Sequence, residues 1–417
     1  MSLAALARRH RHEFGLLLAI MLVLGTAMVT NDSWQTERTA AINAQNLIRT
    51  VSLLGIFSLG AGVVIISGGI DLSAGSVIAF SATVCGGMLL FLADKTVSGG
   101  PDLIHLTGGM VAIAIAVTIG VGILIGTVHA WLITAIRLPP FIATLASLVG
   151  LRSLARILIP DMMSAASGGT MNASKITVQD ADRVLRGLYS EWYIPPLILL
   201  GLALVTWVLL SKTVAGRHLY AMGGNEEAAR LSGIRTDRLK WLAYCISSVT
   251  ASIAGVLMLA QTGNADPSTQ GLGYELYAIA AAVIGGCSLA GGVGSVAGIL
   301  LGAVFLRAVT DSVAKIARGG ISPDELEGLV VGLLILLAVA FNELRGGGGL
   351  RRPLFAGMLG LVSLATLAAL TGVIAALLVA EDKLATGLIA AAVAGAIFLF
   401  KRIWEVRGMR GHGVAGD

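Results

Sequence analysis

The stretch from residue 194 to residue 260 decides how this chain is organised. It reads IPPLILLGLALVTWVLL over residues 194–210, GRHLYAMGGNEEAARLSGI over residues 216–234 and WLAYCISSVTASIAGVLMLA over residues 241–260. The two outer segments are apolar, and about 20 such residues in a helix cross the roughly 30 Å hydrocarbon core of a bilayer. The polar segment between them, residues 216–234, is called the island below. The pattern predicts two membrane spans joined by a structured loop.

The residues of the island predict a short capped helix. Asn225 is a favoured N-cap residue, and the two glutamates that follow lie where the helix dipole stabilises anions. Gly233 follows the last turn, where a left-handed residue ends a helix. Ala228 and Ala229 are expected to leave a smooth face for close approach. A membrane protein with such a loop is expected to offer it to a partner protein.

Composition places the rest of the chain in the membrane. Of the 417 residues, 56% are hydrophobic and 13% are charged, and the mean hydropathy is +0.87. So little polar surface cannot cover a soluble globule. The 54 glycines indicate closely packed and interrupted helices. We predict an all-α polytopic membrane protein with spans at residues 14–30, 47–66, 76–92, 107–128, 141–159, 194–210, 241–260, 275–290, 293–310, 326–342, 356–380 and 384–400.

The charges of the loops predict the orientation of the chain. With the N-terminus inside, the longer inside segments carry 17 Lys and Arg against 7 Asp and Glu, and the outside segments carry 8 against 13. Cytoplasmic loops are enriched in basic residues. Both termini and the loop 211–240 are therefore expected in the cytoplasm.

An internal repeat predicts two halves. ISGGIDLSAGSV at residues 66–77 resembles IGGCSLAGGVGSV at residues 284–296, and both join an inward span to an outward span. Two such halves flank a central pathway in many transporters. The alternative is that glycine pairs simply make easy tight turns. The turn residues of interest are Gly68, Gly69, Asp71, Ser73, Gly75, Gly285, Gly286, Ser288, Gly291 and Gly292.

The predicted core ends near residue 342. Residues 1–342 contain about ten core spans, and a basic glycine-rich linker follows at residues 343–353. Residues 354–417 then form an accessory C-terminal hairpin of two spans and a tail.

Charged residues in membrane spans are costly and are therefore functional candidates. Asp71 is interpreted as a helix cap, and Glu275 and Glu327 as interfacial residues. Arg152 lies more centrally, where it either donates to a polar substrate or braces a neighbouring helix. Arg156, one turn later, is expected to reach the outer surface.

The substrate pathway has four candidate residues. PPFIATL at residues 139–145 predicts a helix that starts abruptly at the inner side, with Thr144 facing a cavity. A rigid turn at the membrane edge is the alternative. Asn46 precedes the second span and has an interfacial alternative as well. The candidates are Asn46, Phe141, Thr144 and Arg152.

Several motifs together resemble a known family. They are GIDLSAGS at residues 69–76, PFIATL at residues 140–145, the island, and IGGCSLAGGVGS at residues 284–295. The chain is similar over about residues 14–342 to the permease subunit of bacterial ATP-binding-cassette sugar importers, the ribose, xylose, arabinose and galactose group. The two spans after residue 343 depart from that family.

The resemblance implies partners and a mechanism. It implies a homo- or heterodimer of permeases in the bacterial inner membrane, a cytoplasmic ATPase that carries ATP and Mg, and a periplasmic or lipid-anchored sugar-binding protein. A monosaccharide would cross by alternating access. The island would dock on the ATPase, through Gly216, Arg217, Tyr220, Gly223, Asn225, Glu226, Glu227, Ala228, Ala229, Arg230 and Gly233.

Other classes are disfavoured by what the sequence lacks. It has no P-loop, no His-Glu-x-x-His and no Cys-x-x-Cys, so we expect no catalytic site, cofactor or metal on this chain, and no nucleic-acid partner. Branched-chain amino-acid permeases of the same superfamily remain an alternative. An ion-coupled secondary carrier is the second alternative, but such carriers usually need central carboxylates.

Overall fold

The computed structural model describes residues 11–30, 34, 36–94, 101–169, 173–178, 183–316, 327–337, 364–366, 368–369, 371–372 and 383–412. The chain divides into two compact units. The first consists of Met1–Ser312 with Val330–Val339, and the second of Val313–Leu329 with Ala340–Asp417.

The described part is mostly helical. In chain order the labelled helices are α2 (Arg11–Thr30), α3 (Glu37–Ile66), α4 (Ala74–Leu92), α5 (Gly108–Thr134), α6 (Pro140–Ser167), α7 (Arg183–Ser190), α8 (Ile194–Lys212), α9 (Val214–Gly224), α10 (Glu226–Leu231), α11 (Thr236–Thr262), α12 (Tyr274–Ile284), α13 (Val296–Ile316) and α16 (Lys383–His412). A shorter apolar helix covers Glu327–Leu337. Eight helices of this part are long and apolar enough to cross a membrane: α3, α4, α5, α6, α8, α11, α13 and α16. The predicted polytopic helical class is confirmed at this level.

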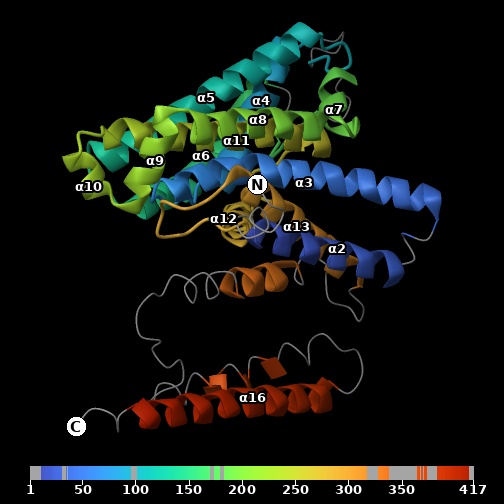
Figure 1. The fold of residues 1–417 in the computed structure, drawn as a ribbon. Helices are drawn as coiled ribbons and strands as arrows, with labels where there is room; N and C mark the ends of the chain where they lie inside the picture. Colours follow the sequence, from blue (N-terminus) through green and yellow to red (C-terminus); the bar gives the residue numbers. More distant parts are fainter. Residues whose placement is uncertain are drawn as a thin grey trace. The chain divides into compact units, whose positions relative to one another are not determined.

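Helices α3, α4 and α11 form the interior of the first unit. The apolar windows of these three helices are mostly buried, whereas only about a third or less of those of α5, α6 and α8 is buried. Helix α11 packs against α3, α4 and α5 (Figure 1). Glycines allow this close packing: a Cβ added at Gly126 of α5 would lie 2.5 Å from the Cα of Cys245 on α11. Small residues permit the same approach of backbones in membrane helices generally.

The predicted span at residues 275–290 is wrong. Helix α12 ends at Ile284 and has only 11 residues, so it is about 16 Å long and cannot cross the bilayer. The backbone then runs without regular structure from residue 285 to residue 295 before α13 begins. Apolar composition continued through Gly285 and Gly286, but a glycine with φ of +94° at residue 286 ends the helix.

A small sheet joins two distant loops. β1 (Ile176–Thr177) pairs antiparallel with β2 (Asn264–Ala265), with Ile176 opposite Ala265. This pairing requires both loops to lie on one side of the helices, as the predicted topology has them. Figure 1 shows α7, which follows β1, at one end of the first unit and α10 of the island at the other.

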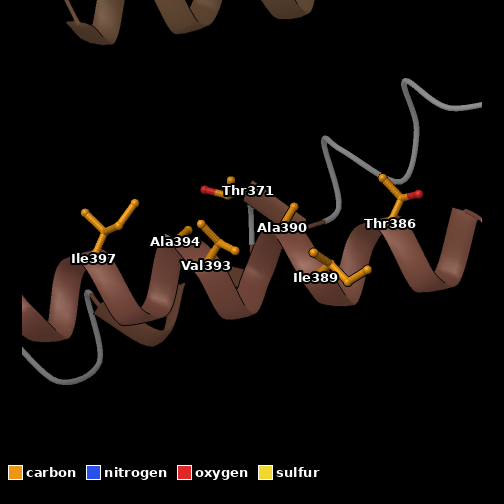
Figure 2. Close-up of a pocket in the computed structure, with 7 residues that line it drawn as sticks. All are labelled: Thr371, Thr386, Ile389, Ala390, Val393, Ala394 and Ile397. Carbon is orange, nitrogen blue, oxygen red and sulfur yellow. The ribbon is translucent and has the colours of Figure 1, made fainter.

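The second unit contains α16, drawn in red in Figure 1. An apolar groove of about 460 Å³ lies on it (Figure 2), lined by Thr371, Thr386, Ile389, Ala390, Val393, Ala394 and Ile397. The predicted linker at residues 343–353 lies outside the described residues. The predicted span at 356–380 is described only at residues 364–366, 368–369 and 371–372, so the accessory hairpin stays a prediction.

Candidate functional site

The island folds into two helices rather than one. Thr213 caps α9 by accepting a hydrogen bond from the Gly216 amide at 3.1 Å. Asn225 ends α9 and caps α10, because its Oδ1 accepts from the Ala228 amide at 3.0 Å. Gly233 has φ of +83°, a left-handed conformation that turns the chain toward α11. The predicted cap and glycine turn are confirmed.

The side of α10 that faces outward is not the side that the sequence analysis expected. Ala229 is only 5% exposed and belongs to the core, so it offers no face to a partner. The six residues of α10 are too few for the pattern to show which side packs inward. The outward side instead presents Leu231, which is 81% exposed, beside the Glu227–Arg230 ion pair at 2.5 Å. The hydrogen bond that Arg230 donates to Glu227 raises the pKa of Arg230, so the two side chains form a charged pair on this surface.

The island contacts both predicted repeat turns through four glycines, Gly68, Gly223, Gly291 and Gly292, which we call the glycine junction. A Cβ added at Gly223 would lie 1.9 Å from the Ile66 carbonyl oxygen and 2.5 Å from the Gly292 amide nitrogen. At Gly291 it would lie 2.8 Å from the Gly68 Cα. The Gly292 amide also donates to the Ile66 carbonyl at 2.9 Å.

A side chain of the island reinforces this junction. The Tyr220 hydroxyl donates to the Gly294 carbonyl at 2.9 Å. Burial raises the pKa of Tyr220, so the phenol keeps the proton that this hydrogen bond needs. The island, the end of α3 and the turn before α13 therefore meet at one place.

The two turns end their helices with the same hydrogen bonds. After α3, the Gly68 amide donates to Ile65 and the Gly69 amide to Val64. After α12, the Gly286 amide donates to Val283 and the Cys287 amide to Ala282. Both patterns are the Schellman type, with a left-handed glycine at Gly68 and at Gly286. In the second turn Gly285 leaves room for the Gly298 carbonyl, and the Ser288 amide donates to Val293.

Asp71 acts as more than the predicted local cap. It is buried, and its Oδ1 accepts from the Ser73 amide at 2.8 Å and the Ser73 hydroxyl at 2.6 Å. Its Oδ2 accepts from the Ser247 hydroxyl on α11 at 2.6 Å. Next to it, the Leu72 amide donates to Thr144 Oγ1 on α6 at 3.1 Å. The nonhelical segment 69–73 is thus held between α6 and α11.

Sequence reasoning missed a second group of polar side chains beside Asp71. His129 is fully buried in α5, and its Nε2 lies 2.7 Å from Ser147 Oγ on α6. Ser76 of α4 donates to the Ser147 carbonyl at 3.2 Å. The sequence interpretation placed His129 in an inside loop, because the apolar window ended at residue 128. A lone histidine next to a loop gives no signal of its partner 18 positions away.

Arg152 braces the loop that precedes α12. It is 8% exposed, and its Nη1 donates to the carbonyls of Pro267 and Gln270 at 2.7 and 2.8 Å. Glu275 is 9% exposed in the first turn of α12, so it is buried inside the protein, and its interfacial depth stays a prediction. It lies against α4, because a Cβ added at Gly75 would meet Glu275 Oε2.

The four pathway candidates do not meet at one site. Asn46 is exposed near the start of α3, where its Oδ1 accepts from Arg49 at 3.1 Å. Phe141 has an exposed side chain at the start of α6. Thr144 and Arg152 are buried on α6, two turns apart, and contact different loops. Buried polar side chains gather instead around the start of α4, where Asp71, Thr144 and Glu275 contact neighbouring elements.

Comparison with known proteins identifies the class. The family model described as the permease component of the branched-chain amino acid transport system matches residues 43–339, and the chain belongs to this family. Such permeases are transporter subunits and are not themselves enzymes.

Several curated relatives are similar over most of the chain. The ribose import permease RbsC of Escherichia coli (strain K12) is 32% identical, covering 78% of this chain and 92% of the relative. RbsC of Bacillus subtilis (strain 168) is 30% identical over the same shares. The galactose/methyl galactoside import permease MglC of Escherichia coli (strain K12) is 28% identical, covering 80% and 94%. No solved structure matches the chain.

Proposed function

We propose that this chain is the permease subunit of an ATP-driven, binding-protein-dependent monosaccharide importer that works by alternating access. The observation that carries the proposal is the contact of the island with both predicted repeat turns at the glycine junction. A loop in that position transmits a push from outside the membrane to the ends of α3 and α12 at once.

The substrate class is argued from the relatives. The family description refers to branched-chain amino acids, whereas the relatives named above import ribose or galactose. A xylose transport permease, XylH of Haemophilus influenzae, is 30% identical over 78% of this chain. Three pentose or hexose importers at this similarity favour a monosaccharide over a branched-chain amino acid.

The outward side of α10 is proposed to dock on a separate cytoplasmic ATPase, which holds ATP and Mg. Leu231 supplies an apolar anchor, and the Glu227–Arg230 pair supplies polar contacts around it. Apolar anchors surrounded by polar groups are typical of hot spots in protein interfaces. The sequence predicts that Gly216 and Gly223 contact the ATPase. Both instead pack against backbone within the permease, so we propose that they hold the island in place.

The remaining assignments follow from this arrangement. We place α10 in the cytoplasm with both termini, and the β1–β2 sheet with α7 on the periplasmic side, where a sugar-binding protein would deliver its cargo. The Schellman turns of α3 and α12 support two pseudo-repeated halves, with α3–α4 matched to α12–α13. A second permease, identical or related, would complete the pathway in the bacterial inner membrane.

The proposal is tested by asking whether an ion gradient or ATP hydrolysis drives uptake. The purified chain is reconstituted in vesicles alone, with a proton or sodium gradient, and also with its ATPase and binding protein plus ATP. Uptake of ribose, xylose, galactose and leucine is measured in both. We expect sugar uptake only in the complete system. Accumulation driven by an ion gradient without the ATPase would establish a secondary carrier instead, and ATP-dependent uptake of leucine alone would establish an amino-acid importer.

A further inference from the structure

Two charged side chains lie deep in the first unit without full hydrogen bonding. Arg152 is 12 residues after the first residue of the 28-residue helix α6, so it lies about 18 Å along a helix of about 42 Å. It is therefore far from both ends. Arg152 Nη2 and Glu275 Oε2 are buried and have no hydrogen-bond partner in the described structure. Burying such groups costs free energy unless something pairs with them.

The loop that Arg152 contacts, residues 263–273, is held by hydrogen bonds of the Gln270 side chain. Gln270 Nε2 donates to Thr262 Oγ1 at 2.9 Å and to the Asn264 carbonyl at 2.8 Å, and its Oε1 accepts from the Asp266 amide at 3.0 Å. Arg152 Nη1 then holds this loop through the Pro267 and Gln270 carbonyls. Arg152 Nη1 and the Gln270 side chain thus both hydrogen-bond to this loop, whereas Arg152 Nη2 makes no hydrogen bond in the described structure.

Glu275 also lies near this loop. Gly75, at the start of α4, leaves room for both the Gly271 carbonyl and Glu275 Oε2, which a Cβ would contact at 2.1 and 2.4 Å. No ion pair joins Arg152 and Glu275 in the described structure. One unused donor therefore belongs to a side chain that binds the Gln270 carbonyl, and one unused acceptor lies beside the contact of Gly75 with the Gly271 carbonyl.

We propose that Arg152 and Glu275 are sugar-contact residues of the transport pathway, with Arg152 Nη2 donating to one hydroxyl oxygen and Glu275 Oε2 accepting from another hydroxyl. A neutral polyol offers both functions and adds no net charge to a region that holds one cation and one anion. This inference rests on the proposed function. A zwitterionic amino acid would also match one cation and one anion, and it is distinguished by the experiment.

Uptake of radiolabelled ribose, xylose, galactose and leucine is measured in the complete reconstituted system for wild type, Glu275→Gln and Arg152→Lys. Glu275→Gln keeps the size of the side chain but removes its charge, and Arg152→Lys keeps the charge but removes the guanidinium group. Ser248→Ala is the matched control, because Ser248 also has a buried oxygen without a partner but lies on α11, outside this group. Binding-protein-stimulated ATP hydrolysis and ATPase co-purification are recorded in parallel.

We expect both variants to lose at least tenfold in sugar uptake and to change the ratio among the three sugars. Stimulated ATP hydrolysis should stay within about twofold of wild type, as in Ser248→Ala. Unchanged uptake and sugar ratios, or an equal loss of uptake and hydrolysis, would overturn the inference while leaving the importer intact. Wild-type uptake of leucine alone would overturn both proposals.

A measurement on the wild type guards against variants that fail to assemble. The purified permease is unfolded by heat in high ribose, xylose or galactose, with sorbitol at the same concentration as the osmotic control. At least one sugar should raise the midpoint temperature of unfolding above the value measured in sorbitol. Identical midpoints in all four solutions would contradict the site.

Discussion

The glycine junction makes one prediction that the structure defines closely. Gly223 and Gly224 are neighbours in the last turn of α9, yet the space that a side chain would enter differs between them. A methyl group at Gly223 would lie 1.9 Å from Ile66 O and 2.5 Å from Gly292 N, whereas nothing lies within 4 Å of one at Gly224. Gly223→Ala therefore probes the junction, and Gly224→Ala is its matched control.

The magnitude follows from the difference between the two variants. Alanine is favoured over glycine within a helix by about 1 kcal/mol, and this gain is shared by both changes. Only Gly223→Ala overpacks the junction, which costs about 1–3 kcal/mol. The clash also lengthens the hydrogen bond that the Gly292 amide donates to the Ile66 carbonyl, and losing this bond costs about 1 kcal/mol. The net difference between the two variants is therefore about 2–4 kcal/mol, and its lower end already shifts the equilibrium away from the closed junction about 30-fold.

The assay compares permeases at equal membrane levels in complex with their ATPase. We expect both variants to co-purify with the ATPase, because the outward side of α10 is unchanged. Binding-protein-stimulated ATP hydrolysis and sugar uptake should fall at least tenfold in Gly223→Ala and stay near wild type in Gly224→Ala. If the two alanine variants hydrolyse ATP and transport sugar equally well, contact at Gly223 does not transmit motion and the reasoning is refuted.

Three further predictions concern the loop, the orientation and the C-terminal segment. Leu231→Ser should leave the fold intact and weaken ATPase co-purification at least tenfold, whereas Ala229→Trp should lower the amount of folded permease, because it inserts a ring into the core; full co-purification of Leu231→Ser would refute the docking side. Cysteines at Ser232 and Ser174 in a cysteine-free background should be labelled from opposite sides of the membrane, and equal labelling of both in intact cells by an impermeant reagent would contradict the topology. Truncation after Arg345 should leave stimulated ATP hydrolysis intact, and its loss in a normally assembled complex would show that residues 346–417 take part in transport.

The sequence alone was sufficient for the features that depend on local chemistry. Long apolar runs predicted the helices that the structure describes at α3, α5, α8 and α11, because burial in a bilayer needs only length and hydrophobicity. The Asn225 cap and the Gly233 turn were predicted for the same reason, since both depend on groups within a few residues. The family was also recognisable, because its motifs are short and contiguous.

Only the tertiary structure decided how these pieces meet. It buried Ala229 and exposed Leu231, because the packing of the island against the rest of the unit orients a six-residue helix that has no clear periodicity. It ended α12 at Ile284 and brought Gly223 against Ile66 and Gly292, which are distant in the chain. It also placed Arg152 and Glu275 around one loop although 123 positions separate them. Contacts of that range depend on the packing of whole helices, and hydrophobic patterns specify which residues are buried but not against which partner.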